Sequence, residues 1–163
     1  TSESRLDPQG KRGDPARTPP TTDHVLDVGS GAGLPGVTLA VTGSPSDPLR
    51  VTCVDAVAKK AGFIRQVAAE LGLKHLSAVH GRIESLALPP ADVITCRAFA
   101  SLSDIVDLTA RHLAVDGVWM ALKGQRPDDE IQALPPNVEV FHVEPIEVPF
   151  LDAQRCIVWM RKT

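Results

Sequence analysis

From His24 to the C-terminus, short runs of β-branched and apolar residues alternate with longer stretches whose apolar positions recur every three or four residues. The short runs predict strands and the longer stretches predict helices. Strands are expected at His24–Val28, Arg50–Asp55, Leu76–Val79, Asp92–Cys96, Gly117–Leu122, Val138–Val143 and Arg155–Met160. The alternation indicates β-α-β units around a mainly parallel sheet. The last two strands are predicted to form an antiparallel pair that closes the sheet.

Four helices are predicted between these strands, at Pro35–Val41, Val57–Leu71, Ser101–Leu113 and Asp128–Leu134. The second helix carries a single apolar stripe, and Gly72 follows it as a C-terminal stop. Ser101 and Asp104 have the spacing of a capping box, in which each side chain bonds a backbone N–H of the first turn. They mark the start of the third helix.

The first 22 residues differ from the rest of the chain. They are rich in Pro, Gly, Arg and Asp and have no apolar periodicity, which predicts an irregular lead-in over 1–22 and one domain over 23–163. A chain of 163 residues is long enough for one compact domain. The formal net charge of −3 argues against a dedicated nucleic-acid-binding protein. It is compatible with an enzyme that meets RNA through a local basic face.

Cellular location and assembly are suggested only indirectly. Cys53, Cys96 and Cys156 lie far apart in apolar stretches, a pattern that fits neither a disulfide framework nor a metal site and indicates reduced thiols in the cytoplasm. No apolar run approaches the roughly 18–20 residues of a spanning helix, and the polar start does not look like a signal peptide. A monomer is expected, since no long apolar surface stripe is left over.

A glycine-rich loop, Asp27-Val28-Gly29-Ser30-Gly31-Ala32-Gly33, follows the first strand. Glycine accepts positive φ and has no Cβ, so such a backbone can approach a ligand closely. Asp27, at the end of the first strand, can face a cationic amino group. Asp55, at the end of the second, can accept hydrogen bonds from both hydroxyls of a ribose. This combination is the usual pattern of S-adenosylmethionine-dependent methyltransferases.

The same region leaves a second interpretation open. Gly31-Ala32-Gly33-Leu34-Pro35-Gly36 also spells the dinucleotide fingerprint, with Asp55 at a suitable distance for the ribose of a nicotinamide cofactor. However, no second dinucleotide-binding half follows, and the chain ends in a strand pair. The favoured fold is therefore an α/β, Rossmann-like class I methyltransferase with a mainly parallel seven-stranded sheet and a C-terminal antiparallel hairpin. A nicotinamide-dependent oxidoreductase is the competing class, which cofactor-binding tests would separate.

Residues that follow the other strands are further site candidates, because open α/β sheets bind ligands beyond the carboxyl ends of their strands. Arg82-Ile83-Glu84, after the third strand, could flank an adenine with backbone amides and an apolar side chain. Arg97, after the fourth, could reach a cofactor carboxylate or a substrate phosphate. Lys123, after the fifth, could face the substrate. Each also has a structural interpretation, as a helix start, an ion pair or a surface charge.

Several longer motifs occur in a recognisable order. They are Leu26–Gly36, Val54–Ala56, Lys59-Lys60, Phe63–Val67, Gly81–Glu84, Arg97–Leu102 and Ala121–Gln125. With them, the chain from about Val25 onward resembles the bacterial family of 16S ribosomal RNA guanine-N7 methyltransferases, also called the glucose-inhibited division protein B family. The glycine loop is shared by many methyltransferases, whereas Leu34-Pro35-Gly36, Arg97-Ala98-Phe99-Ala100 and Leu122-Lys123-Gly124 are more specific to this family.

The resemblance implies transfer of a methyl group from S-adenosylmethionine to N7 of one guanine in 16S ribosomal RNA, with S-adenosylhomocysteine as product. It implies cofactor contacts from Asp27, Gly29, Ser30, Gly31, Gly33, Leu34, Asp55, Ala56, Ile83, Glu84 and Arg97. It suggests RNA phosphate contacts from Lys59, Lys60, Arg65, Lys123 and Arg126. Guanine N7 has a lone pair and no proton, so no general base is expected. Catalysis would rest on positioning, to which Arg97 and Lys123 would contribute.

Family members carry an N-terminal helical region ahead of the first strand, which Thr1–Thr22 does not resemble. We expect this region to be missing or truncated here, with RNA binding affected more than cofactor binding. A methyltransferase of the same fold that acts on a small molecule or a protein is the alternative. The modest net charge favours that alternative slightly, and the ordered motifs disfavour it.

Overall fold

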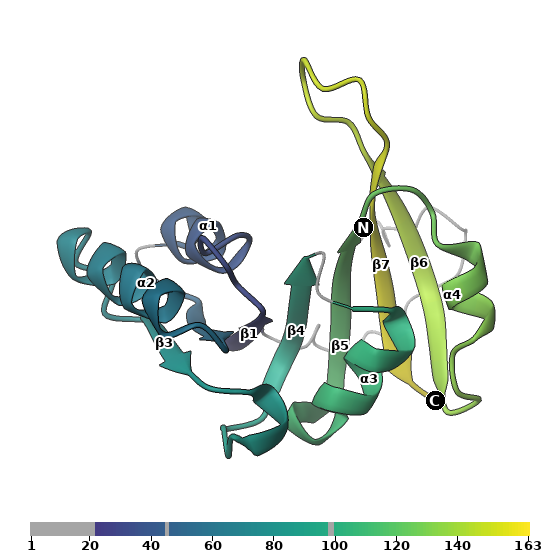
Figure 1. Ribbon diagram of the computed structural model, residues 1–163, viewed down its shortest axis with the longest axis horizontal. Coiled ribbons are helices and arrows are strands. Elements are labelled where there is room, and N and C mark those ends of the chain that lie inside the picture. Colours follow the sequence, from purple (N-terminus) through teal and green to yellow (C-terminus); the bar gives the residue numbers. More distant parts are fainter. Residues whose placement is uncertain (1–21, 45, 98–99) are drawn as a thin grey trace, which may run out of the picture.

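The computed structural model describes residues 22–44, 46–97 and 100–163. Within these ranges, seven strands form one sheet in the order β3-β2-β1-β4-β5-β7-β6 (Figure 1). The strands are β1 (His24–Val28), β2 (Arg50–Asp55), β3 (Leu76–His80), β4 (Ala91–Arg97), β5 (Leu113–Lys123), β6 (Val138–Ile146) and β7 (Arg155–Lys162). Strands β1 to β5 run parallel, and β7 is antiparallel to both β5 and β6. The predicted fold class is confirmed.

The helices are α1 (Gly36–Thr42), α2 (Ala58–Glu70), α3 (Leu102–Thr109) and α4 (Asp128–Gln132), with 3-10 turns η1 (Ile83–Ser85) and η2 (Ala110–His112). The capping box at the start of α3 is confirmed, because the Ser101 hydroxyl accepts the Asp104 N–H at 3.2 Å. The predicted lead-in, except for Thr22, lies outside the described residues, as do Ala98 and Phe99 of the family-specific motif.

The boundary between the third helix and the fifth strand differs from the prediction. Helix α3 ends at Thr109, η2 follows, and β5 already begins at Leu113 rather than at Gly117. The pairing of β4 with β5 shifts register between Ala91 and Val93. The first residues of β5 therefore lie outside the regular ladder, and they lack the alternation of buried and exposed positions by which a strand is recognised.

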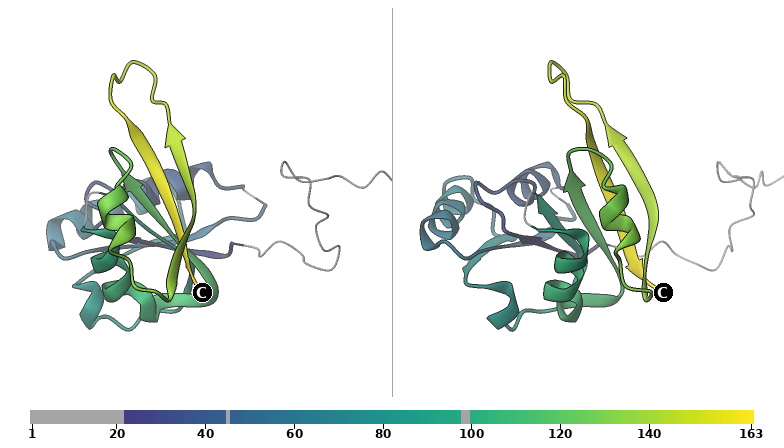
Figure 2. Two further views of the ribbon diagram at one scale, coloured as in Figure 1. Left: turned by 90° about the vertical axis from the view of Figure 1, so that its right-hand side faces the viewer. Right: turned by 45° about the vertical axis from the view of Figure 1, so that its right-hand side comes forward.

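The central strand β1 is buried on both faces of the sheet. In β1, Val25 packs into a cluster with Ala40 of α1 and Ile64 of α2, whereas its neighbour Leu26 belongs to a second cluster with Ile105 of α3. Because successive strand residues point to opposite faces, α1 and α2 cover one face and α3 the other. The arrangement can be followed in Figure 1 and Figure 2.

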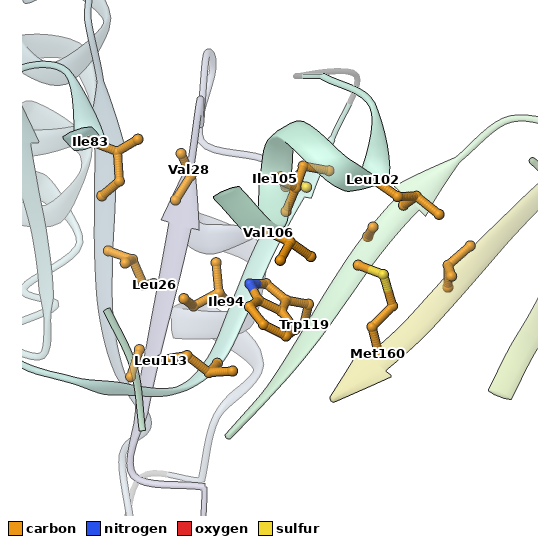
Figure 3. Close-up of a cluster of buried hydrophobic side chains, with 14 of the residues drawn as sticks. Leu26, Val28, Ile83, Ile94, Leu102, Ile105, Val106, Leu113, Trp119 and Met160 are labelled. Atoms are coloured by element: carbon orange, nitrogen blue, oxygen red, sulfur yellow. The ribbon is translucent and has the colours of Figure 1, made fainter. Parts of the chain in front are cut away.

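Trp119 of β5 lies at the centre of the larger core cluster (Figure 3). Its side chain is fully buried, and its indole N–H donates to the Thr109 hydroxyl at 2.8 Å. Thr109 in turn donates to the carbonyl oxygen of Ile105. The indole is thus satisfied at the end of α3, which attaches this helix to the sheet.

The carboxyl ends of β1 to β5 meet at one edge of the sheet, as parallel strands require. Residue Lys123 at the end of β5 pairs with Cys156 near the start of β7, and Ile146 at the end of β6 pairs with Arg155. The loop joining β6 and β7 therefore extends from this same edge, away from the rest of the domain (Figure 1 and Figure 2). In the part of the chain that the structure describes, no helix is long and apolar enough to cross a membrane.

Candidate functional site

The glycine loop turns sharply at the carboxyl end of β1. Gly29, Gly31 and Gly33 have φ of 69°, 56° and 92°, values that residues with a Cβ rarely adopt. The N–H of Gly29 and that of Ser30 donate to the Val54 carbonyl at 2.9 and 3.2 Å, which attaches the loop to β2. A Cβ on Gly31 would meet nothing within 4 Å. The loop therefore presents open backbone at this point.

Asp27 is fully buried beneath the loop, and only one of its carboxylate oxygens is satisfied. Oδ2 accepts the Gly36 N–H at 2.9 Å, whereas Oδ1 has no hydrogen-bond partner. Burial raises the pKa of Asp27 to about 6. The Gly36 hydrogen bond and the positive charge of Arg97 oppose that rise. A buried acceptor without a partner is uncommon, and a cationic amine or a water at this position would satisfy it.

Asp55 lies at the end of β2, on the other side of the glycine loop. It is 7% exposed, and its two oxygens accept the N–H groups of Gly31 at 2.9 Å and Val57 at 2.8 Å. A carboxylate offers about four acceptor positions. Asp55 thus holds the loop and keeps capacity for two further donors, such as the hydroxyls of a ribose.

A pocket of about 260 Å³ opens beside the loop. It is lined by Val28, Gly29, Val54, Ala56, Gly81, Arg82, Ile83, Glu84 and Leu108. Its volume lies just below the roughly 300–1,000 Å³ typical of small-molecule sites, which suits one part of a larger cofactor. The predicted residues Gly29, Ala56, Ile83 and Glu84 are brought together here.

Val28 belongs to the predicted glycine loop, whereas sequence reasoning assigned no cofactor contact to three other lining residues, Val54, Gly81 and Leu108. Val54 belongs to a predicted strand and Gly81 follows one by two residues, and their apolar or small character gave no sign of a ligand. Leu108 comes from α3, and only the packing of this helix onto the sheet brings it to the pocket. A periodic apolar position in a helix is typical of a core residue, so the sequence does not mark Leu108 as a pocket residue.

Arg111 was also missed, although it contacts the pocket wall from behind. Its Nη2 lies within hydrogen-bond distance of the carbonyl oxygens of Ile83 and Leu86, both at 3.0 Å, and of that of Glu84. The neighbouring His112 is buried, and its Nε2 lies 3.1 Å from the Ile83 carbonyl oxygen. A single arginine in a helical stretch carries no pattern from which these contacts could be foreseen.

The other predicted cofactor residues have distinct settings. The Ser30 hydroxyl is buried and donates to the Asp27 carbonyl oxygen at 2.8 Å, so it stabilises the loop. Leu34 is 44% exposed on the loop. Arg97 is exposed at the end of β4, close enough for its charge to lower the pKa of Asp27. Its predicted contact with a cofactor carboxylate or a substrate phosphate stays a prediction.

The predicted RNA-binding residues do not form one group of free cations. Lys59 and Lys60 are exposed at the start of α2. Arg65 donates from Nε to the Ala78 carbonyl at 2.9 Å, and Arg126 pairs with Asp128 at 2.7 Å on the surface. These side chains keep donors that an RNA phosphate could use.

Lys123 differs from the other basic candidates. Its ammonium group lies 2.8 Å from both the Ala100 carbonyl oxygen and Oε2 of Glu130, and its side chain is 15% exposed. The same Glu130 oxygen accepts the Leu102 N–H at the start of α3. The charge of Lys123 is thus compensated within the protein. Its predicted positioning role and its predicted RNA contact both stay predictions.

The three cysteines are buried and free. Burial raises the pKa of the Cys53 and Cys96 thiols to about 12. Both are therefore neutral thiols that contribute to packing and do not supply a nucleophile. Among the described residues, no group of three His, Cys, Asp or Glu side chains is arranged to hold a metal ion.

The site geometry agrees with the comparison of the sequence with protein families. The sequence profile of the family described as rRNA small subunit methyltransferase G matches residues 16–158. The chain belongs to this family. One relative, the ribosomal RNA small subunit methyltransferase G of Methylibium petroleiphilum, is 60% identical over 146 residues, which are 90% of this chain and 65% of that protein. The family assignment removes the oxidoreductase interpretation.

Known structures support the fold independently. TrmN from Thermus thermophilus superposes with a TM-score of 0.69 at 23% identity, over 87% of this chain and 44% of that one. An S-adenosylmethionine-dependent methyltransferase from Clostridium acetobutylicum superposes with a TM-score of 0.65 at 12% identity, over 87% and 85% of the two chains. At these identities the likeness shows the class I methyltransferase fold. The chain spans about 60% of the length of its curated methyltransferase G relatives.

Proposed function

We propose that this protein binds S-adenosylmethionine and transfers its methyl group to N7 of a guanine in 16S ribosomal RNA. Membership of the rRNA small subunit methyltransferase G family supports the reaction and the RNA class. The structural observation that carries the proposal is the pair of carboxylates at the glycine loop. Asp27 has an unsatisfied buried oxygen and Asp55 has spare acceptor capacity, on either side of open glycine backbone.

The residues present fit each part of this cofactor. The free oxygen of Asp27 suits its cationic amino group, directly or through a water. Asp55 suits the ribose hydroxyls. The pocket lined by Val28, Ala56 and Ile83 suits the adenine, because its lining is mostly apolar and its volume is small. The three positions follow one another along the carboxyl edge from β1 toward β3.

When bound, S-adenosylmethionine supplies an electrophilic methyl group, which the proton-free lone pair of guanine N7 accepts without a general base. The protein then has to orient the base and exclude water. Neutral thiols at Cys53 and Cys96 agree with a reaction that forms no covalent enzyme intermediate. Arg97, at the end of β4 and close enough to affect the pKa of Asp27, is proposed to help orient the base.

The RNA is proposed to lie across the carboxyl edge of the sheet. Lys59 and Lys60 follow Asp55 at the start of α2, and Arg126 follows β5, so exposed cations flank both sides of the loop. Phosphate contacts of this kind position an RNA without reading its sequence. The target guanine must be unstacked for N7 to reach the cofactor. We further propose that the protein acts as a monomer in the cytoplasm.

Calorimetric titration with S-adenosylhomocysteine, run beside NAD, tests the cofactor. We expect binding of S-adenosylhomocysteine alone. Asp55→Ala should weaken it by roughly 1–3 kcal/mol, through loss of charge-assisted hydrogen bonds to the ribose. Binding of NAD in its place would overturn the assignment of the glycine loop.

Transfer of a labelled methyl group tests the acceptor. Small ribosomal subunits and 16S RNA lacking the modification are offered separately, with a total protein extract and a small-molecule extract beside them. Label in the RNA as 7-methylguanine supports the proposal. Label only in the protein or small-molecule fraction would instead support the alternative of a same-fold methyltransferase with another substrate.

A further inference from the structure

We propose that Arg111 is a positioning residue for the cofactor, whose guanidinium group holds the turn that forms the adenine-facing wall of the pocket. The inference rests on the proposed function, because it assigns the pocket lined by Ile83 and Glu84 to the adenine. Arg111 itself does not line that pocket. It would act through the backbone of residues 83–86.

The turn has few bonds of its own. It comprises a single 3-10 turn, Ile83–Ser85, with two backbone hydrogen bonds: the Ser85 N–H donates to the Arg82 carbonyl oxygen at 2.9 Å, and the Leu86 N–H donates to the Ile83 carbonyl oxygen at a longer 3.4 Å. The carbonyl oxygens of Glu84 and Leu86 have no backbone donor within the turn. Left to themselves, they would be satisfied by water, and the turn would sample other conformations.

Arg111 supplies the missing donors. Its Nη2 contacts the carbonyl oxygens of Ile83, Glu84 and Leu86 together, so that one cationic group faces three carbonyl dipoles. Since Nη2 carries two hydrogens, at least one of these contacts is shared. Hydrogen bonds from a charged donor are roughly twice as strong as neutral ones.

The guanidinium group is also held in place on its other side. Arg111 Nε lies 3.1 Å from Nε2 of His112, which is 3% exposed and itself lies 3.1 Å from the Ile83 carbonyl oxygen. Depending on its tautomer, the imidazole accepts from the arginine or donates to the carbonyl. In either case the side chains of Arg111 and His112 lie against the same turn, residues 83–86.

The arrangement joins the two halves of the pocket wall. Leu108 of α3 lines the same pocket as Ile83 and Glu84 of the turn, and Arg111 follows Leu108 three residues later. The turn is closed tightly at its start as well, because a Cβ on Gly81 would lie 2.9 Å from the Leu86 side chain. By holding residues 83–86 against α3 and η2, Arg111 keeps the width of the pocket constant before the cofactor binds. Preorganisation of this kind raises affinity without a direct contact.

The test compares Arg111→Met, which keeps the aliphatic stem, with Arg111→Lys, which keeps the charge and part of the donor set. Arg161→Met serves as the matched control, because Arg161 also bonds through its guanidinium, to Glu139, but lies on β7 away from the pocket. Calorimetry measures the Kd of S-adenosylhomocysteine and of adenosine, well below the thermal midpoint of each variant. Methylation assays measure the KM for the cofactor, the KM for RNA and kcat.

We expect Arg111→Met to raise the Kd of both ligands by the same factor, roughly tenfold or more. Arg111→Lys should fall between it and the wild type, and Arg161→Met should match the wild type. The KM for the cofactor should rise, while kcat at saturating cofactor and the KM for RNA change little. A general loss of structure would lower kcat and the thermal midpoint without this selective pattern.

A folded Arg111→Met variant that binds both ligands within twofold of the wild type would overturn the inference. So would unequal effects on adenosine and S-adenosylhomocysteine, which would place the damage outside the adenine wall. Failure of the wild-type protein to bind S-adenosylhomocysteine is a different result. It would overturn the proposed function and, with it, the role of Arg111.

Discussion

Asp27 and Gly36 are joined by a buried hydrogen bond of 2.9 Å, from the first N–H of helix α1 to a carboxylate at the end of β1. The contact leaves no room for a side chain on the glycine. A Cβ at position 36 would lie 2.7 Å from Oδ2 of Asp27 and 2.5 Å from Sγ of Cys53. The third glycine of the apparent dinucleotide fingerprint therefore serves close packing of α1 on the sheet, directly beneath the cofactor loop.

Gly36→Ala should lower the free energy of unfolding by about 1–3 kcal/mol, because the added methyl group must displace a buried carboxylate and a buried thiol. Urea denaturation gives the value. Gly62→Ala is the matched control, since Gly62 lies within α2 and a Cβ there meets nothing within 4 Å. That change should stabilise the protein by roughly 0.5–1 kcal/mol. Equal effects at both positions would contradict the packing argument.

The raised pKa of Asp27 predicts a pH-dependent stability. Its pKa is 3.8 for a free carboxyl and about 6 in the folded protein, so between these values the folded state binds more protons than the unfolded state. The stability contributed at Asp27 therefore falls as pH rises through this window. When the pH is lowered from 8 to 4, the free energy of unfolding of the wild type should increase by roughly 2–3 kcal/mol relative to that of Asp27→Asn.

Denaturation of the two proteins across this pH range measures the difference, in which the titration of the other carboxylates cancels. Binding should show the opposite trend. Because the cationic amino group of the cofactor prefers an ionised Asp27, affinity for S-adenosylhomocysteine should fall below about pH 6 in the wild type only. A stability difference that does not change with pH would contradict the assignment.

The partly buried pair of Lys123 and Glu130 should contribute measurably to stability. Lys123→Met leaves the Glu130 carboxylate and the Ala100 carbonyl without a major partner, and should cost about 1–3 kcal/mol. A double-mutant cycle with Glu130→Gln should give a coupling of about 1 kcal/mol. The exposed pair of Arg126 and Asp128, with side chains more than 60% exposed, should couple by less than about 0.5 kcal/mol. Equal coupling in the two pairs would mean that burial does not distinguish them.

Lys59 and Lys60 are expected to contact RNA phosphates. Replacing both with Ala should weaken RNA binding and reduce the slope of log affinity against log salt by roughly 1–2, while leaving affinity for S-adenosylhomocysteine unchanged. Lys74→Ala is the control, because Lys74 is exposed just before the amino end of β3, at the opposite edge of the sheet. A salt slope that stays the same after the double replacement would remove these lysines from the RNA surface.

The sequence alone determined the order and type of the elements, the glycine loop and both of its carboxylates. These features are local. Strand alternation, the Ser101–Asp104 capping box and glycines at positive φ each depend on residues a few positions apart. Asp27 and Asp55 could be placed together at the glycine loop, because both stand at strand ends and parallel strands bring those ends to one edge of the sheet.

Only the tertiary structure decided the contacts between distant segments. Arg111 bonds carbonyl oxygens 25 to 28 positions earlier in the chain, and Leu108 reaches the pocket because α3 packs onto the sheet. Lys123 reads as an exposed cation in the sequence, yet the fold pairs it with Glu130. Which donors and acceptors meet, and how much water they lose, depends on the topology of the sheet. Periodicity and local spacing carry no information on which distant groups meet or on how far they are removed from water.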